Sequence, residues 1–177
     1  MFWPQIFDLV LGAGIILLQV GIVAVVALHF FKKDAAIYRW IQRHNIMLAF
    51  LLSLGALVGS LFYSEVLGLQ PCLFCWWQRI CTYPLALILG IALWKNEGAV
   101  IKKYAITLAT VGSLFAFYHY LIEKFSVIAA TVDCTAVGTV SCAESPVSVF
   151  GGYITIPMMS LTILIATILL LSMKKKS

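Results

Sequence analysis

Long apolar runs separated by short polar segments dominate the pattern of the chain. Each run has about the length that crosses the hydrocarbon core of a bilayer as a helix, which takes about 20 residues. The connections are too short to form a separate soluble domain. We therefore predict an all-α integral membrane protein whose spanning helices cover Leu9–Phe31, Ile46–Leu67, Trp76–Trp94, Tyr104–Ile122 and Tyr153–Ser172.

The composition excludes a soluble protein, because 63% of the residues are hydrophobic and 11% are charged. The first run is longer than the apolar part of a secretory signal and ends in Lys32 and Lys33, so we expect it to span the bilayer. The segment 32–45 mixes charged and aromatic residues, and we expect it to lie on the membrane surface. Pro84 and Pro157 are predicted to kink or interrupt the third and fifth helices.

Positive charges gather in the first connection, the third connection and the C-terminal tail. These segments hold ten of the twelve Lys and Arg residues, and with five crossings they share one side of the membrane. By the positive-inside rule that side is the cytoplasm, which puts the N-terminus outside and the C-terminus inside. The net charge of +5 is thus a topology signal, and we expect a lipid bilayer and no nucleic acid as a partner.

Cys72 and Cys75 form a Cys-x-x-Cys motif at the outer start of the third helix. Pro71 suits the first turn of a helix, where its missing N–H loses no partner. Thiols at a helix N-terminus face the positive end of the helix dipole, which lowers the thiol pKa. The motif therefore predicts reversible redox chemistry, although a static disulfide or half of a metal site fits the same two residues.

Arg79 shares a helical face with this motif, because positions 72, 75 and 79 follow the spacing i, i+3, i+7. It lies about 6 Å beyond Cys75 along the helix axis. An arginine within a spanning helix is costly and marks a functional candidate. Its guanidinium could hold a quinone carbonyl oxygen or stabilise the Cys75 thiolate; the alternative is a side chain that snorkels to the interface.

Trp76 and His119 are further candidates for contact with a flat ring. Trp76 also fits an aromatic belt at the headgroup level. His119 is either a belt residue or a group that hydrogen-bonds a quinone oxygen and moves a proton. Cys81 is expected to be a buried, inert thiol.

Cys134 and Cys142 form a second pair, on the long loop before the last helix. The topology places this loop outside, where disulfides persist. The pair is either a fixed staple or a means of passing electrons from a protein partner. The four outer cysteines would also suit a tetrahedral zinc site, so a zinc-stapled structural membrane protein is an alternative.

The segment 70–84, with Cys72, Cys75 and Arg79, resembles the redox helix of the disulfide bond formation protein B (DsbB) family and its BdbC-like relatives. The segments 118–120 and 150–157 and the loop with the second cysteine pair are also similar to that family. The resemblance implies a four-helix redox domain over 46–177, preceded over 1–45 by an additional transmembrane helix and a cytoplasmic connector.

The activity that this resemblance implies is a quinone-dependent oxidation of protein dithiols at the bacterial cytoplasmic membrane. A DsbA-like thioredoxin-fold thiol oxidase would attack the Cys134–Cys142 disulfide, with Cys134 carrying the mixed disulfide. Cys72–Cys75 would reoxidise that pair, with Cys72 facing the loop. Cys75 would pass electrons to ubiquinone or menaquinone held beside Arg79.

One feature qualifies the resemblance, and a second enzyme family fits part of the pattern. Seven residues separate Cys134 from Cys142, a short spacing that is similar to BdbC-like relatives and leaves the division of roles between the two open. A vitamin K epoxide reductase-like enzyme is an alternative, since that family also couples loop cysteines to a quinone. There, however, the loop pair precedes the Cys-x-x-Cys helix.

Overall fold

Most of the chain is helical in the computed structural model, which describes residues 3–31, 36–95, 97–129 and 141–173. Each predicted span corresponds to a long helix: α1 Trp3–Phe31, α3 Asn45–Leu61 with its π-helical continuation η1 Phe62–Val66, α4 Leu73–Lys95, α5 Gly98–Lys124 and α7 Ile156–Ser172. Within the described residues, Trp3–Phe31, Asn45–Val66 and Val100–Lys124 are long and apolar enough to cross a membrane, and α7 is a shorter apolar helix.

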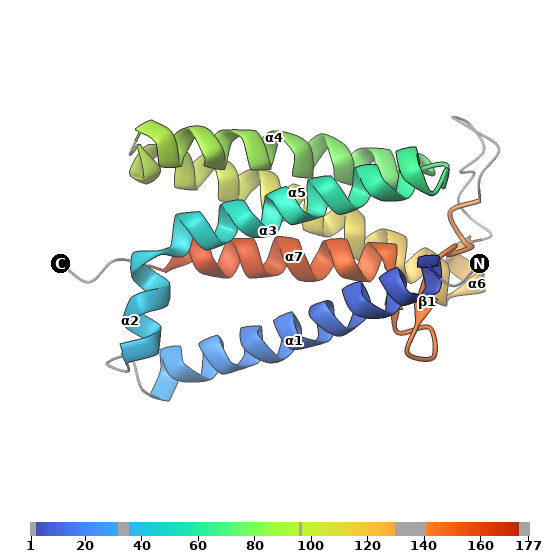
Figure 1. Cartoon of the computed structure of the whole chain (residues 1–177), viewed down its shortest axis with the longest axis horizontal. Helices are drawn as coiled ribbons and strands as arrows, with labels where there is room; N and C mark the ends of the chain where they lie inside the picture. The colour runs from blue at the N-terminus through green and yellow to red at the C-terminus, as the bar shows by residue number, and fades with distance from the viewer. Residues whose placement is uncertain (1–2, 32–35, 96, 130–140, 174–177) are drawn as a thin grey trace.

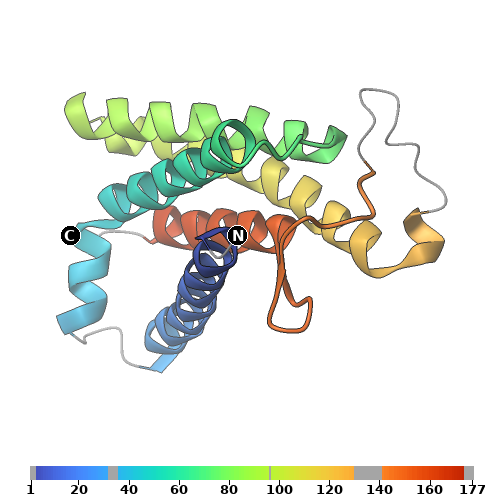
Figure 2. The ribbon, with the colours of Figure 1, turned by 45° about the vertical axis from the view of Figure 1, so that its right-hand side comes forward.

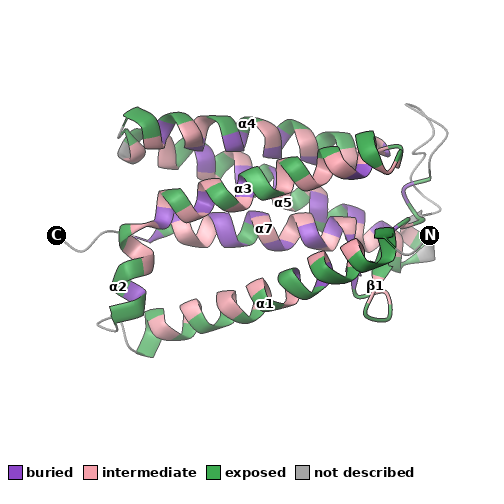
Figure 3. Cartoon of the chain, in the orientation of Figure 1, coloured by how far each residue is buried: buried purple, intermediate pink, exposed green. Residues whose placement is uncertain are grey.

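Helices α3, α4, α5 and α7 form a bundle, and α1 runs along one side of it (Figure 1 and Figure 2). Small side chains let helix backbones approach closely, which is how helices associate in lipid. In the buried cluster between these helices half of the residues are accordingly alanine: Ala49, Leu85, Leu89, Ala105, Ala109, Ala116, Leu164 and Leu171. The buried positions lie between the helices and the exposed ones on their outer faces (Figure 3).

The outer surface of the bundle is apolar. Leu87, Trp94 and Leu114 are exposed to 65%, 84% and 64%. So much exposed apolar surface suits contact with lipid rather than with water. The predicted class, an all-α membrane protein, is confirmed.

A short helix, α2 Ala36–Arg43, connects α1 to α3 and crosses the end of the bundle (Figure 1). Its Tyr38 is buried and hydrogen-bonds to Nδ1 of His29 on α1 at 2.6 Å. Its Ile37 and Trp40 are exposed. The amphipathic surface segment predicted over 32–45 thus contains a short helix.

Two turns shape the opposite end of the bundle. Gly68 lies in the left-handed region (φ +67°) between η1 and the start of α4. A small antiparallel hairpin, β1 Ser148–Val149 with β2 Ile154–Thr155, precedes α7. Its turn places Gly151 and Gly152 at positive φ, a conformation that glycine adopts without a steric penalty.

The hairpin corrects one expectation about the last helix. Ile154 and Thr155 pair with β1, so α7 begins at Ile156 and not at Tyr153. Pro157 therefore stands in the first turn of α7, where its missing N–H leaves no hydrogen bond unmade. The expectation that Pro157 lies inside a helix and interrupts it is wrong, whereas Pro84 does lie inside α4.

Candidate functional site

Cys72 and Cys75 meet at the start of α4. Cys72 immediately precedes the helix and Cys75 stands in its first turn, and both are free thiols. A thiol–thiol hydrogen bond joins their sulfurs at 3.0 Å, and the backbone N–H of Cys75 points to Cys72 Sγ at 3.4 Å. The two sulfurs are therefore positioned to close a disulfide with little movement.

His119 on α5 lies against the same sulfur. Its Nε2 is 3.5 Å from Cys72 Sγ, and the ring is almost fully buried and stacks on Phe74. The side-chain nitrogen of Gln78 donates to His119 Nδ1 at 3.0 Å. Because Nδ1 accepts, the hydrogen-bond network assigns the imidazole proton to Nε2, which faces Cys72.

These contacts decide which sulfur carries the negative charge. The hydrogen bond with Cys75 and then that with His119 lower the pKa of Cys72 to about 4, against the opposing effect of burial. Cys75 is the thiol that keeps its proton and shares it with Cys72. At neutral pH the reduced pair is therefore a thiolate at Cys72 beside a thiol at Cys75.

This charge assignment predicts an acid-resistant thiolate. We expect the ultraviolet thiolate absorbance of the reduced protein to persist from neutral pH downward and to disappear only near pH about 4, because a lowered pKa keeps the ionised form above that value. Cys72→Ala should remove the signal and His119→Ala should shift its loss to higher pH. A signal that is already lost below pH ~8, as for an ordinary cysteine, would contradict the assignment.

Arg79 lies one turn further along α4 and binds α3. Its Nε donates to Ser60 Oγ at 3.0 Å and its Nη2 to the Ser60 carbonyl at 3.2 Å. Its guanidinium carbon lies 5.5 Å from the Trp76 ring centre and 6.0 Å from that of Tyr83. Arg79 is thus fixed between α3 and two aromatic rings, with N–H donors to spare, since a guanidinium carries five.

A cavity of about 670 Å³ connects these residues, a size typical of small-molecule sites. Cys72, Cys75, Arg79 and His119 all line it. Trp76, a candidate both for ring contact and for the aromatic belt, is half exposed, lies against Arg79 and is not among the residues that line this cavity. The structure therefore brings the sulfur pair, the cation and the imidazole to one end of an apolar chamber.

The comparisons with known proteins agree on one family. The model of disulfide bond formation protein DsbB matches residues 42–173. This chain belongs to the DsbB family. It is 42% identical over 114 residues to the SPbeta prophage-derived disulfide bond formation protein B of Bacillus subtilis, which covers 64% of this chain and 74% of that protein.

Other DsbB-family relatives match over a longer range. Disulfide bond formation protein C of Bacillus subtilis is 37% identical over 127 residues, 72% of this chain and 89% of that protein. A probable disulfide formation protein of Chlamydia caviae is 36% identical over 140 residues, 78% of this chain and 98% of that protein. No solved structure matches the chain. Membership supports a disulfide-forming membrane protein with thiol oxidoreductase activity.

The second cysteine pair is seen in part. Cys134 lies outside the described residues. Cys142 is disulfide-bonded and only 1% exposed, and it belongs to one buried cluster with Cys72 and Ile122. The fold therefore brings Cys142 close to the first cysteine pair.

Sequence reasoning missed Ser60 and Glu123. Ser60 is a small polar residue in the apolar run of α3, and nothing in the sequence links it to Arg79. Glu123 lies one turn beyond His119, lines the cavity and faces Ser145 and Thr155. Its i, i+4 spacing from His119 was the signal that could have found it.

The sulfur and imidazole groups also form a possible metal-ligand set. One ligand atom each from Cys72, Cys75 and His119 lie within 4.8 Å of one another. Thiolate and imidazole are ligands that zinc prefers, but structural zinc sites take four. Cys142 is held in a disulfide, so its sulfur is not a thiolate ligand here.

Proposed function

We propose that the chain is a membrane thiol oxidoreductase that reoxidises a DsbA-like thioredoxin-fold partner and passes the electrons to a membrane quinone. One observation carries the proposal. Cys72 is in one buried cluster with the disulfide-bonded Cys142 and also lines the apolar cavity beside Cys75, Arg79 and His119. The position of Cys72 between the loop cysteine and the cavity suits transfer of electrons from one to the other.

Two dithiol–disulfide transfers, each made of two thiol–disulfide exchange steps, would move the electrons through the chain. A thiolate of the partner attacks the Cys134–Cys142 disulfide, by position at Cys134; one S–S bond breaks as the mixed disulfide forms. The partner's second thiol then closes its own disulfide and leaves two thiols on this chain. One of these attacks Cys72 of an oxidised Cys72–Cys75 pair and releases Cys75, and closure of Cys134–Cys142 leaves Cys72 and Cys75 reduced.

The end of the cavity that is lined by Cys72, Cys75, Arg79 and His119 suits a quinone ring. Arg79 supplies N–H donors suited to a carbonyl oxygen, and His119 offers its Nε2 proton in the same chamber. A bound quinone, ubiquinone or menaquinone, would supply an acceptor for two electrons and two protons. Cys75 is the sulfur nearer in sequence to Arg79, and we assign it to the acceptor side.

The oxidation of a reduced thioredoxin-fold dithiol tests this proposal. Purified protein should oxidise that dithiol catalytically when quinone is added, and only stoichiometrically without it. Benzoquinone and naphthoquinone acceptors compared at equal concentration would show which ring is preferred. A rate that does not depend on quinone would refute the proposed acceptor.

We further propose a bacterial cytoplasmic membrane location with the redox loop outside. The support is the concentration of Lys and Arg in the connections that would face the cytoplasm. A thiol reagent that cannot cross membranes should label Cys134 in intact, mildly reduced cells. Labelling that requires permeabilised cells would reverse the orientation.

A zinc-stapled protein is the second candidate, favoured by the clustering of Cys72, Cys75 and His119. Metal analysis of the purified, reduced protein separates the two functions. One zinc per chain together with no dithiol oxidation would support the structural site and exclude the oxidase.

A further inference from the structure

The additional helix α1 lines the same cavity as the redox residues. It lies outside residues 42–173, which the family model matches. Leu11, Gly14, Leu17 and Leu18 of α1 nevertheless form part of the cavity wall. We infer that α1 completes a binding groove for the isoprenoid tail of the quinone, an inference that rests on the proposed use of a quinone.

The cavity is long as well as apolar. It extends on α3 from Ser60, the partner of Arg79, to Leu51. Nine residues of α helix rise about 13 Å at 1.5 Å per residue. Leu17 and Leu18 of α1 also line it. An elongated chamber with its charged groups beside the sulfurs suits a ring that carries a hydrocarbon chain better than a ring alone.

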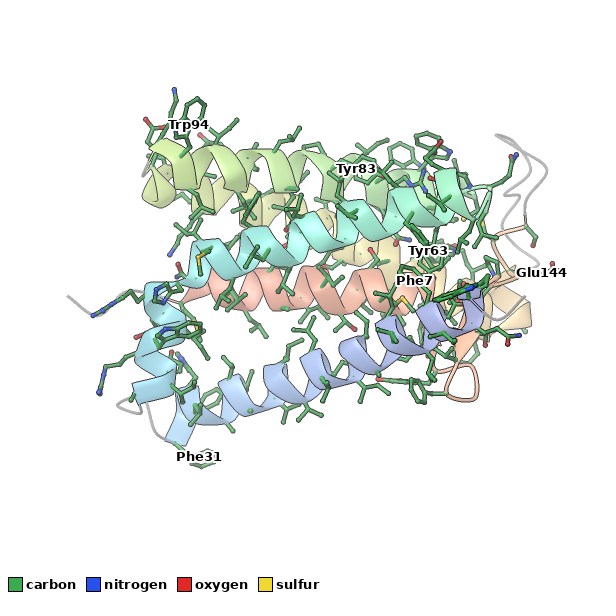
Figure 4. All side chains as sticks on the ribbon, in the orientation of Figure 1. Phe7, Phe31, Tyr63, Tyr83, Trp94 and Glu144 are labelled. Atoms are coloured by element: carbon green, nitrogen blue, oxygen red, sulfur yellow. The ribbon has the colours of Figure 1, made fainter. Side chains whose placement is uncertain are left out.

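Specific contacts hold α1 against the bundle at the outer end of this chamber. The ring of Phe7 lies 4.4 Å from that of Phe62 and 5.6 Å from that of Tyr63 in η1, centre to centre. The Tyr63 hydroxyl donates to Asp8 Oδ1 at 2.7 Å. Phe7 and Tyr63 lie close together where α1 meets the bundle (Figure 4).

A second set of contacts holds α1 about three turns further along. Gln19 Nε2 donates to Thr162 Oγ1 of α7 at 3.0 Å, and the Tyr153 hydroxyl donates to Gln19 Oε1 at 3.2 Å. Polar contacts of this kind hold helices together in lipid. Gly14 lies between these two sets of contacts along α1. The helix is therefore held against the bundle on both sides of Gly14.

Glycines leave open space along this wall. A Cβ built at Gly14 or at Gly55 of α3 meets nothing within 4 Å, and both glycines line the cavity. Gly12, by contrast, has Val149 Cγ2 only 2.7 Å from such a Cβ. Because both glycines also line the cavity, we expect a larger side chain at Gly14 or Gly55 to narrow it instead of displacing protein.

The test compares Gly14→Leu with Gly21→Leu, a matched control. Gly21 is also on α1 and also has open space at its Cβ, but it does not line the cavity. Binding is measured in the full chain by quenching of tryptophan fluorescence, and KM by dithiol oxidation. The probes are two quinones with the same ring, one with an isoprenoid tail and one without.

We expect Gly14→Leu to raise the Kd and the KM of the tailed quinone at least about fivefold, the lower end of the cost of overpacking a site. Gly14→Leu should leave the tail-free quinone unchanged, and Gly21→Leu should change neither. Gly55→Leu, on α3, should act like Gly14→Leu.

Three results would overturn the inference, and the third is distinguishable from the first two. In the first, the Gly14→Leu variant binds the tailed quinone as the wild-type chain does, while the wild-type chain still oxidises dithiols with quinone. That result would exclude the role of α1 and leave the proposed function standing. If the Gly55→Leu variant binds the tailed quinone more weakly and the Gly14→Leu variant binds it normally, the cavity holds the tail but α1 takes no part. No quinone dependence in the wild-type chain would remove the proposed function and this inference with it.

Discussion

Cys75→Ala is expected to abolish quinone-dependent turnover. Cys72 would then have no sulfur with which to form its disulfide, so electrons that enter through the loop could not leave. The first exchange should survive, because it uses the Cys134–Cys142 disulfide. We therefore expect a burst in which each chain oxidises one partner dithiol and then stops, measured by rapid quenching and quantification of partner thiols.

Cys81→Ala is the matched control for this experiment. Cys81 is also a free cysteine of α4, buried to 4% exposure, and it packs against Gly112 instead of lining the cavity. Its loss should leave turnover at the wild-type level. Sustained turnover by Cys75→Ala would exclude the proposed route.

Arg79→Ala should reduce kcat/KM for quinone by about 10- to 100-fold. This is the range expected when a hydrogen bond to a charged group, worth about 1.5–3 kcal/mol, is lost. The exchange between the partner and the loop disulfide should keep its rate, because the described contacts of Arg79 are with Ser60 of α3 and with the rings of Trp76 and Tyr83. Steady-state kinetics with quinone, compared with single-turnover exchange without it, separate the two steps.

Two further variants show how Arg79 acts. Arg79→Lys keeps the charge but loses the planar fork of donors, so an intermediate loss is expected. Ser60→Ala removes the hydroxyl that accepts from Arg79 Nε and should produce a smaller defect of the same kind. A full-size effect of Arg79→Ala on single-turnover exchange would instead point to a structural role.

The sequence predicted the face of α4 that carries the chemistry. Helical spacing alone puts Cys72, Cys75 and Arg79 on one side, and the structure confirms that all three line one cavity. Trp76 was one candidate for contact with a ring, and the structure places it against Arg79 and outside the cavity lining. A periodicity of 3.6 residues identifies neighbours on one helix but not which helix packs against them.

The error at Pro157 has a similar origin. The apolar run from Tyr153 continues smoothly into α7, so hydropathy alone extends the helix. The pairing of Ile154 and Thr155 with β1 is a contact with residues 148–149, outside the run. Local pattern cannot detect a strand whose partner is decided by tertiary packing.

By itself the sequence determined the membrane class, the approximate positions of the five long helices and the helical face shared by Cys72, Cys75 and Arg79, because the bilayer fixes helix length and the helix fixes spacing. Tertiary structure alone decided that His119 points its Nε2 to Cys72, that Ser60 holds Arg79 and that Cys142 lies in one buried cluster with Cys72. It also decided that α1 lines the cavity. These contacts join residues far apart in the chain, and helix packing, which depends on small side chains and a few polar contacts, sets them.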